Sequence, residues 1–479
     1  MTMFATAYHR ALAVHLPPRM TAYLAGLACL NAIAAIHAST ILPGGVATFT
    51  LRGLLFVAFV CFYRACRGGA GRRESVGGRQ GPVVLVLCVL TAGAIVWNIT
   101  AIGKMPRDLA DSTRYWNDAA AETDCATELL LAGHNPYASF DLIACFTRLH
   151  MNGRYTTPLR AGAFASSWHS PSLQARITLF ARAKRQHIVH PTEFESTLSY
   201  PAGAFLVLAP FAAAGWHDVG TLNFCLLLAI YVVVGLRGPP RARLWIAPLV
   251  LSSSVLWTYG LRGFTEGPVL LLLVCWWMAR DAGSRWRWVS ILALGLAVST
   301  RQEGWLYAPY DIVLAWQTIG RRTAIAHVAV LLGVFLVING VFMLATFEAW
   351  RRGVGGPLLD PMFPGGDGLI GLGVGGVLGL WPRPLYTMLE GAALALCLWR
   401  YSRICRLHPD AALVLALVPL VFAWRSLSVY FLLPLPLLCL YPVWRQVASV
   451  RQKASVRAVQ REQATATHER RQALEAMIT

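Results

Sequence analysis

Long apolar runs separated by short polar segments dominate this chain. Runs such as 82–102 and 323–347 are mostly apolar along their whole length. Each is long enough to cross a hydrocarbon core of about 30 Å as a helix. Because a backbone in lipid must satisfy its own N–H and C=O groups, helices are the expected form. The pattern predicts an all-α fold, namely a polytopic transmembrane helical bundle of about 12 spans.

Basic residues between the apolar runs predict how the bundle is oriented. Segment 64–79 carries five Arg and one Glu, which is typical of a cytoplasmic loop. The basic loops at 237–243, 279–287, 320–322 and 400–406 fall on the same side only if two segments do not cross. These are 201–215, which is short and contains two Pro, and the Gly-rich 368–381. Both compositions suit re-entrant or interfacial segments.

The resulting layout has four parts. Residues 1–102 hold the first three transmembrane helices, and 103–199 form a large extracytoplasmic loop with an acidic amphipathic helix. Residues 200–444 form a membrane-embedded helical bundle that includes the two segments that could be re-entrant, and 445–479 form a basic cytoplasmic tail. We therefore expect a multi-pass protein of the cell (inner) membrane with both termini cytoplasmic.

Composition agrees with a membrane protein. The chain is 56% hydrophobic and 14% charged, whereas soluble domains carry about 25% charged residues. The net charge of +19 comes from short clusters between apolar runs, so it indicates cytoplasmic loops and not nucleic-acid binding. Most of the cysteines lie inside apolar runs. Cys125 and Cys145 share the large loop and could form a disulfide if that loop faces an oxidising compartment.

Acidic residues concentrate in the large loop. Nine of the 23 Asp and Glu lie in 103–199, and seven of these lie between Asp108 and Asp141. Asp118 and Glu122 are four residues apart, so they share one face of a predicted helix, which Gly133 would end. This pattern fits an amphipathic helix on the outer membrane face. The alternative is that the acids only solvate a loop and cap helix ends.

Three arginines lie where the layout places the outer face. They are Arg262, Arg301 and Arg425, and each stands at the end of an apolar run or within one. Arginine at an outer boundary runs against the positive-inside trend, so a specific anionic partner would explain it. The alternative is that these side chains extend to the interface or form structural pairs with Glu266 or Glu303.

Several patches resemble one enzyme family. The pattern NDAxAxxxxxxxLLLxGxNPY, from Asn117 to Tyr137, is similar to the first outer loop of the GT-C glycosyltransferases, above all the polyprenol-phosphate-mannose-dependent mannosyltransferase-like group. Further patches resemble that group in the expected order; they are SYPAGAFLVLAPF (199–211), RQEGWLYAPY (301–310), DPMFPGGDGLIGLG (360–373) and RSLSVYFLLP (425–434). The similarity covers most of the chain from about residue 108 to residue 434.

The resemblance implies a fold and an activity. The fold would be a GT-C-like bundle whose first outer loop carries juxtamembrane helices. The enzyme would be a hexosyltransferase, with mannose as one candidate sugar, that moves the sugar from a polyprenyl-phosphate donor to a hydroxyl of a glycan or glycolipid acceptor. Its partners would be the bilayer, this donor and this acceptor, with no nucleic acid.

The resemblance also assigns roles to residues. Asp118 matches the catalytic carboxylate, which would act as general base toward the acceptor, with Glu122 and Asp124 as further candidates. The donor phosphate would be held by Arg301, Gln302, Arg262 and Arg425, since a guanidinium pairs bidentately with phosphate. The sugar or acceptor would be contacted by Tyr137, Tyr200 and Asn135.

Two features depart from the family. The acidic position is followed by AAAETD, without the aromatic residue that often follows it in the family. The side-by-side acidic pair of some relatives is also missing, so we expect no metal and no other cofactor. The insertion 150–198 has no counterpart in the resemblance, and could shape acceptor choice or act as a mobile lid.

Other functions are compatible with the same pattern. The main alternative is a transporter or flippase of an amphiphilic, lipid-linked substrate, which would be expected to show internal repeats. No repeat is found around 201–215 or 368–381. A non-enzymatic scaffold is a further alternative, and it would tolerate loss of Asp118 whereas the enzyme would not.

Overall fold

The computed structural model describes residues 18–38, 44–67, 81–110, 115, 117–237, 243, 245–260 and 264–445. Within these ranges the chain is mostly helical, which confirms the predicted helical character. The one sheet among the described residues pairs two short parallel strands, β1 (Gly365–Gly366) and β2 (Arg425–Ser426). The basic segment 68–80 and the tail 446–479 lie outside the described residues.

Four helices of the described part are long and apolar enough to cross a membrane. They lie in α2 (Pro18–Ala38), α3 (Gly44–Arg67), α11 (Val219–Leu236) and α17 (Arg321–Leu359). On α17, Leu344 is 92% exposed and Val337 is 76% exposed, which suits contact with lipid. These helices support membrane association. The predicted total of about 12 crossings goes beyond them and stays a prediction.

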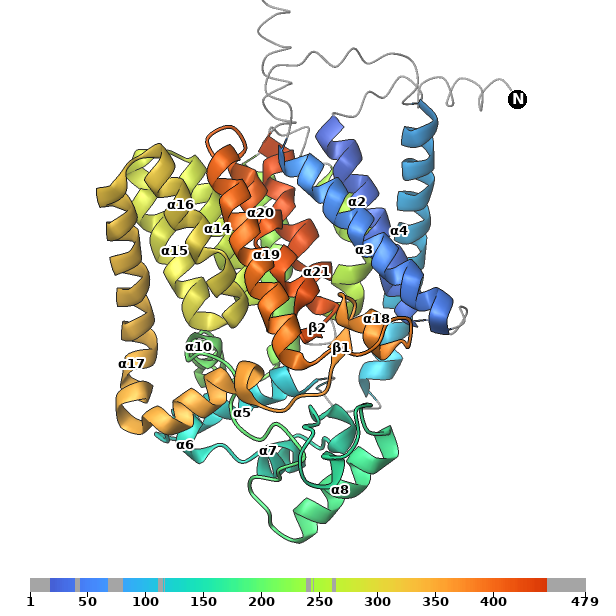
Figure 1. The fold of residues 1–479 in the computed structure, drawn as a ribbon, viewed down its shortest axis with the longest axis vertical. Helices are drawn as coiled ribbons and strands as arrows, with labels where there is room; N and C mark the ends of the chain where they lie inside the picture. Colours follow the sequence, from blue (N-terminus) through green and yellow to red (C-terminus); the bar gives the residue numbers. More distant parts are fainter. Residues whose placement is uncertain are drawn as a thin grey trace, which may run out of the picture.

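The remaining helices of the bundle pack beside these four (Figure 1). They are α4 (Gly81–Ala110), α13 (Ile246–Ser252), α14 (Gly267–Asp281), α15 (Arg287–Thr300), α16 (Ala308–Thr318), α19 (Arg383–Ile404), α20 (Ala412–Leu415) and α21 (Val429–Leu432). Apart from those of α4, their facing apolar side chains share one buried core with α2, α3 and α11. Between helices surrounded by lipid, van der Waals packing of these side chains stabilises the bundle.

The two segments predicted not to cross contain only short helices. Segment 201–215 forms α9 (Gly203–Leu206) and α10 (Ala209–Ala213), and segment 368–381 forms α18 (Ile370–Val374). A helix rises about 1.5 Å per residue, so none of these three reaches across a hydrocarbon core of about 30 Å. This length agrees with the layout that keeps the basic loops on one side.

Residues 117–199 form a compact unit at one end of the bundle, here called the loop body (Figure 1). Its helices are α5 (Asp118–Leu131), α6 (Pro136–Ser139), α7 (Leu142–Arg148) and α8 (Leu173–Arg185), with the 3₁₀ turns η1 (Gly153–Tyr155) and η2 (Gly162–Phe164). Phe180 of α8 packs on Phe146 of α7 and on Phe194. The insertion 150–198 therefore shares an apolar core with α5 and α7.

Helix α17 bends where it reaches the loop body. The backbone of Thr346 departs from helical geometry (φ −153°, ψ 67°), and the chain then runs beneath the bundle (Figure 1). Asn135, which caps α6, donates from Nδ2 to the Thr346 hydroxyl at 2.8 Å. The bend thus places the end of α17, up to Leu359, beside the loop body.

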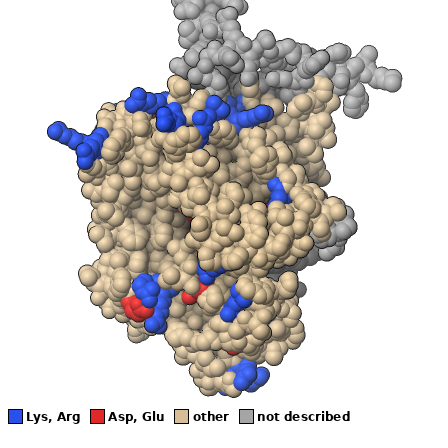
Figure 2. All heavy atoms as spheres, viewed as in Figure 1, with Lys and Arg blue, Asp and Glu red and all other residues tan. Residues whose placement is uncertain are grey.

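Charged side chains are unevenly distributed along the axis of the bundle. On the face shown in Figure 2, Lys and Arg gather along the end opposite the loop body, and a broad band with few charged side chains separates them from the charges near the loop body. This distribution is typical of a membrane protein whose basic end is cytoplasmic.

Cys125 of α5 and Cys145 of α7 form a disulfide, with their Cα atoms 5.9 Å apart. The disulfide that the sequence left open is thus present in the structure. Disulfides persist in oxidising compartments, so the bond agrees with an extracytoplasmic position of the loop body.

Removal of this disulfide is expected to destabilise the loop body. The bond closes a loop with a sequence separation of 20 residues, for which chain entropy corresponds to about 3 kcal/mol. We expect Cys125→Ser/Cys145→Ser to lower the free energy of unfolding by about this amount in urea titrations of the purified protein. Cys88→Ser, at an exposed free cysteine, is the control and should leave the titration unchanged. Equal stability of all three proteins would contradict the expectation.

Candidate functional site

Helix α5 begins and ends where its sequence predicts. Asn117 caps it, since the Asn117 side chain accepts a hydrogen bond from the Ala120 N–H at 2.8 Å. Asp118 occupies the first turn, where the positive end of the helix dipole favours a carboxylate. Gly133 follows the helix with φ +79°, a left-handed conformation that ends helices. The prediction of a helix ending at Gly133 is confirmed.

Backbone pairing inside the loop body brings distant segments to Asp118. The N–H of Glu195 donates to the Thr157 carbonyl at 3.0 Å, and the Leu159 N–H donates to the backbone carbonyl of Glu193 at 2.8 Å. Leu159 also forms an isolated antiparallel β-bridge with Met362, which follows the end of α17. Residues 157–159, 193–195 and 360–362 therefore meet at the start of α5.

Two carboxyl groups of α5 face this meeting point. The Thr157 hydroxyl donates to Oδ2 of Asp118 at 2.5 Å, which fixes the orientation of that carboxylate. Glu122 lies one turn further along and is buried. Burial raises the pKa of Glu122 well above its ordinary value, and the nearby carboxyls of Asp118 and Glu195 raise it further. Glu122 therefore holds its proton more tightly than a solvent-exposed glutamate does.

Glu195 is the third carboxyl of this group, and the Ser199 hydroxyl donates to it. Burial raises the pKa of Glu195 to about 7, while the bond from Ser199 and the charge of Arg425 oppose the shift. Asp118 and Asp360 add to it. We call Asp118, Glu122 and Glu195 the carboxyl cluster.

The raised pKa of Glu195 predicts a pH-dependent stability. A carboxyl with a pKa of about 7 in the fold and 4.5 in its ordinary state is favoured in the folded protein while it is protonated. Its contribution is complete below pH 4.5 and is lost as pH rises to about 7, in total about 3 kcal/mol.

Glu195→Gln is expected to remove this loss. The variant should therefore be more stable than the parent protein at pH 8 and similar to it at pH 4.5. Thermal unfolding across this pH range measures the difference. Glu193→Gln, which alters a carboxyl that accepts the Ala163 N–H, is the matched control. A parallel pH profile for all three proteins would refute the expectation.

Tyr200 connects the carboxyl cluster to Arg301. The guanidinium of Arg301 lies 4.8 Å from the centre of the Tyr200 ring. Burial raises the pKa of the Tyr200 phenol; Arg301 lowers it, and Glu122, Asp118 and Glu195 raise it. Tyr200 therefore lies within electrostatic range of both groups, and its contact with the sugar stays a prediction.

Arg301 is already bound by two acids. Its Nε and Nη2 donate to Glu303 at 3.1 and 3.0 Å, and Nη2 also lies 3.2 Å from Glu266. Its Nη1 donates to Thr265. The structural pairing that the sequence allowed as an alternative is thus present with both acids. Because its donors are engaged, Arg301 has no free edge for a bidentate phosphate.

Arg425 is differently placed. Its position on β2 pairs with Gly365 of β1, and Nη1 donates to the thioether sulfur of Met362 at 3.0 Å. The charge of Arg425 acts on Glu195, so the guanidinium lies on the side of the carboxyl cluster. Among the described residues no acid forms an ion pair with Arg425. This half-buried cation is the arginine best suited to an anionic ligand.

Three further predicted site residues join segments of the backbone. Gln302 donates to the Ser199 carbonyl at 2.6 Å and to Val354 of α17 at 3.1 Å. The Tyr137 hydroxyl donates to the Tyr200 carbonyl at 2.7 Å. Asn135 binds Thr346, as described above. These contacts position Tyr200 and α17, and Arg262 lies outside the described residues.

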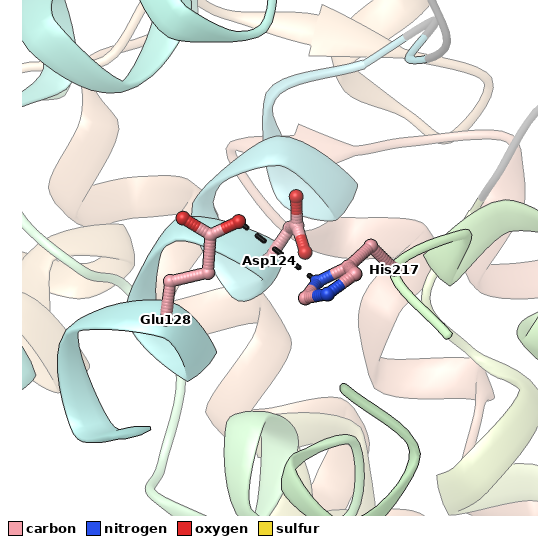
Figure 3. Close-up of side chains that lie close together, drawn as sticks. All are labelled: Asp124, Glu128 and His217. Atoms are coloured by element: carbon pink, nitrogen blue, oxygen red, sulfur yellow. Dashed lines mark ion pairs between the residues drawn. The ribbon is translucent and has the colours of Figure 1, made fainter. Parts of the chain in front are cut away.

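Asp124 lies apart from the other two catalytic candidates. It accepts a hydrogen bond from the Tyr115 hydroxyl at 2.7 Å, on the side of α5 that faces His217. Figure 3 shows Asp124 and Glu128 on α5 with His217 directed toward them. Nδ1 of His217 is 4.0 Å from Glu128. The predicted catalytic trio is thus divided between two sides of one helix.

The group of Asp124, Glu128 and His217 has the spacing of a metal site. One ligand atom from each lies within 4.8 Å of the others, and such a donor set suits a divalent cation. Arg148, however, forms an ion pair with Glu128, and Tyr115 bonds Asp124. These contacts join α5 to α7 and to His217 without an ion. The expectation of no metal stays a prediction.

The residues missed by sequence reasoning come from the insertion, from the residue directly after it and from the C-cap of α17. They are Thr157, Glu195, Ser199 and Asp360. Glu195 stands four residues before Ser199, at the head of the patch 199–211, and this proximity is the one feature of the sequence that could have pointed to it.

Comparison with protein-family models, curated proteins and solved structures gives no match. Function is therefore inferred from the arrangement of these side chains.

Proposed function

We propose that the chain is a membrane-embedded glycosyltransferase of the GT-C type, a hexosyltransferase. It moves a sugar from a polyprenyl-phosphate donor to an acceptor hydroxyl at the extracytoplasmic face of the cell (inner) membrane. The observation that supports this best is the meeting of Asp118, Glu122 and Glu195 with Arg425 where the loop body joins the bundle. Within the part of the chain that the structure describes, Arg425 has no acidic ion-pair partner.

Asp118 is the proposed general base. Thr157 holds one of its oxygens, and the carboxylate takes the proton of the acceptor hydroxyl as that oxygen bonds to the anomeric carbon. The bond from the anomeric carbon to the donor phosphate breaks in the same step, and its electron pair leaves with the phosphate. The polyprenyl phosphate is the leaving group.

Arg425 is the proposed partner of that phosphate. A guanidinium compensates the charge that develops on the leaving phosphate, and this stabilises the transition state more than the ground state. The raised pKa values of Glu122 and Glu195 reduce the negative charge nearby, so that an anionic donor can approach. Tyr200 provides an aromatic wall held by Arg301 and Tyr137.

The proposed orientation places the loop body outside and the basic end of the bundle in the cytoplasm. The disulfide in the loop body supports this placement, because the cytosol keeps thiols reduced. The arginines at the opposite end support it through the positive-inside trend. Donor and acceptor would then meet on the outer side, where the lipid-linked donor is anchored in the bilayer.

Transfer by the purified protein tests the proposal. The full chain in nanodiscs is given a panel of radiolabelled polyprenyl-phosphate hexoses, including mannose, and an extract of membrane glycolipids as acceptor. A labelled acceptor product is expected. Movement of labelled donor across sealed vesicles without any product would instead identify the transporter or flippase alternative.

Arg425→Gln is expected to weaken donor use. Loss of one charge-assisted contact to phosphate should lower kcat/KM for the donor by about tenfold or more. Arg154→Gln, at an exposed arginine of the same loop body, is the matched control and should keep the parent value. Unchanged donor kinetics in Arg425→Gln would exclude Arg425 as the phosphate partner.

A further inference from the structure

A cavity of about 270 Å³ opens at the end of the bundle opposite the loop body. It is lined by the ends of α14 to α17 and by residues near η6 (Pro409–Ala411) and the last described turn. None of the residues of the carboxyl cluster lines it. Its size is near the lower limit of small-molecule sites, which suits a small head group.

The acids of this cavity are all engaged by donors from the protein. Asp311 accepts from Trp276 at 2.9 Å and lies 2.6 Å from Nδ1 of His327. Asp410 accepts from Trp277 at 2.9 Å and from Arg445 at 2.8 Å.

Asp281, the third acid of the cavity, is also engaged by donors from the protein. Asp281 accepts a hydrogen bond from the Tyr441 hydroxyl at 2.7 Å and forms an ion pair with Arg445. Every oxygen of the three carboxylates therefore has a donor inside the protein. Asp281 and Asp410 are balanced by Arg445 and by Arg19, which lies 3.8 Å from Asp410, and Asp311 orients His327. No ion pair joins these acids to Arg280 or Arg287 among the described residues.

Two arginines line the cavity without an acidic partner among the described residues. Arg280, at the end of α14, lies with its guanidinium 4.6 Å from the Trp277 ring centre and is half-buried. Arg287 is the first residue of α15, and that helix has no side-chain cap. A cation at a helix N-terminus is disfavoured by the dipole unless an anion lies between them.

His327 adds a buried hydrogen-bonding atom to the same cavity. The side chain is 5% exposed, its Nδ1 faces Asp311, and its Nε2 has no partner among the described residues. Leaving such an atom unsatisfied in the interior costs free energy. In either protonation state, Nε2 can bond an oxygen or a hydroxyl of a bound group.

Exposed tryptophans flank lining residues of the cavity in the sequence, and the Trp288 ring centre lies 6.5 Å from that of His327. Trp286, Trp288 and Trp316 are 39%, 52% and 53% exposed, and they lie next to lining residues on η4 (Ser284–Trp286), α15 and α16. Tryptophan is enriched at the depth of lipid head groups. These tryptophans are typical of an end of the bundle that lies at the depth of lipid head groups.

We propose that this cavity binds a phosphate ester at the basic face of the bundle, with Arg280 and Arg287 as its ligands and His327 at its base. The site is distinct from the carboxyl cluster and does not depend on sugar transfer. Phosphate fits because two guanidinium groups and a helix N-terminus together provide many donors to its several oxygens. The ester is either the head group of an anionic phospholipid or a soluble molecule.

Equilibrium binding of two probes tests the proposal on the delipidated full chain. The probes are phosphatidylglycerol, counted by native mass spectrometry against phosphatidylcholine, and soluble glycerol 3-phosphate, measured by calorimetry. Arg280→Gln/Arg287→Gln should raise the Kd of the probe that binds by about tenfold or more. Arg403→Gln, an exposed arginine at the same end of the bundle, is the matched control and should bind as the parent does.

The outcomes separate the two sources of the phosphate. Selective binding of phosphatidylglycerol that depends on Arg280 and Arg287 identifies a lipid head group, and binding of glycerol 3-phosphate with the same dependence identifies a soluble ester. Arg280→Lys/Arg287→Lys keeps both charges and should bind the probe more tightly than Arg280→Gln/Arg287→Gln does. This comparison distinguishes loss of charge from misfolding. Binding that is absent, or equal in the Gln pair and the control, would overturn the proposal.

Discussion

Asp118→Asn is expected to lower the rate of sugar transfer by about 100-fold to 10,000-fold, the usual contribution of a general base. The amide keeps the size of the side chain and can still accept from Thr157, so the start of α5 should persist. It cannot take a proton from the acceptor. The loss should appear in kcat, with donor binding little changed.

The control for Asp118→Asn is Glu348→Gln. Glu348 lies on the same side of the molecule, on the far part of α17, where it is exposed and pairs with Arg351 and Arg352. This variant should transfer sugar at the parent rate. Full activity of Asp118→Asn in nanodiscs would show that Asp118 is not the base, and attention would then move to Glu122 and Glu195.

Arg301→Gln is expected to destabilise the protein by about 3–5 kcal/mol, since it leaves buried acids without their cation. Glu266 is buried and Glu303 is nearly so, and Arg301 is the cation that pairs with both among the described residues. The expected result is a lower Tm and a lower yield of folded protein. Removal of the charges with Arg301→Met/Glu266→Gln/Glu303→Gln should restore much of the lost stability.

This pair of variants separates the two roles that the sequence allowed for Arg301. A structural role predicts loss of folded protein in Arg301→Gln and recovery in the triple variant. A donor-phosphate role predicts normal stability, a raised KM for the donor and no recovery. Arg352→Gln, at an exposed ion pair on α17, is the stability control and should change little.

Local features of the chain were predictable because their causes are local. The helix from Asp118 depends on the Asn117 cap and on a glycine that adopts φ +79°, both of which act within a few residues. The short segments 201–215 and 368–381 follow from length and from Pro or Gly content. The proximity of Cys125 and Cys145 in one loop likewise allowed the disulfide.

Only some residues of the candidate site were predictable from the sequence. Asp118, Glu122 and Asp124 are equivalent by type and nearly so by position. Only the packing around α5 divides them, since Thr157 and Glu195 approach one side and Tyr115 and His217 approach the other. The sequence motif predicts helix α5, but it does not show which face of that helix residues 150–198 cover.

The sequence by itself determined that this is a helical, membrane-type chain with an acidic helix in its longest polar segment, because hydrophobic length and helix-capping chemistry act over short stretches of chain. Only the tertiary structure decided which charges are engaged. Arg301 is bound by Glu266 and Glu303, whereas Arg425, Arg280 and Arg287 have no acidic partner among the described residues. The physical reason is that ion pairing depends on distances of a few ångströms between segments far apart in the chain, and folding alone sets those distances.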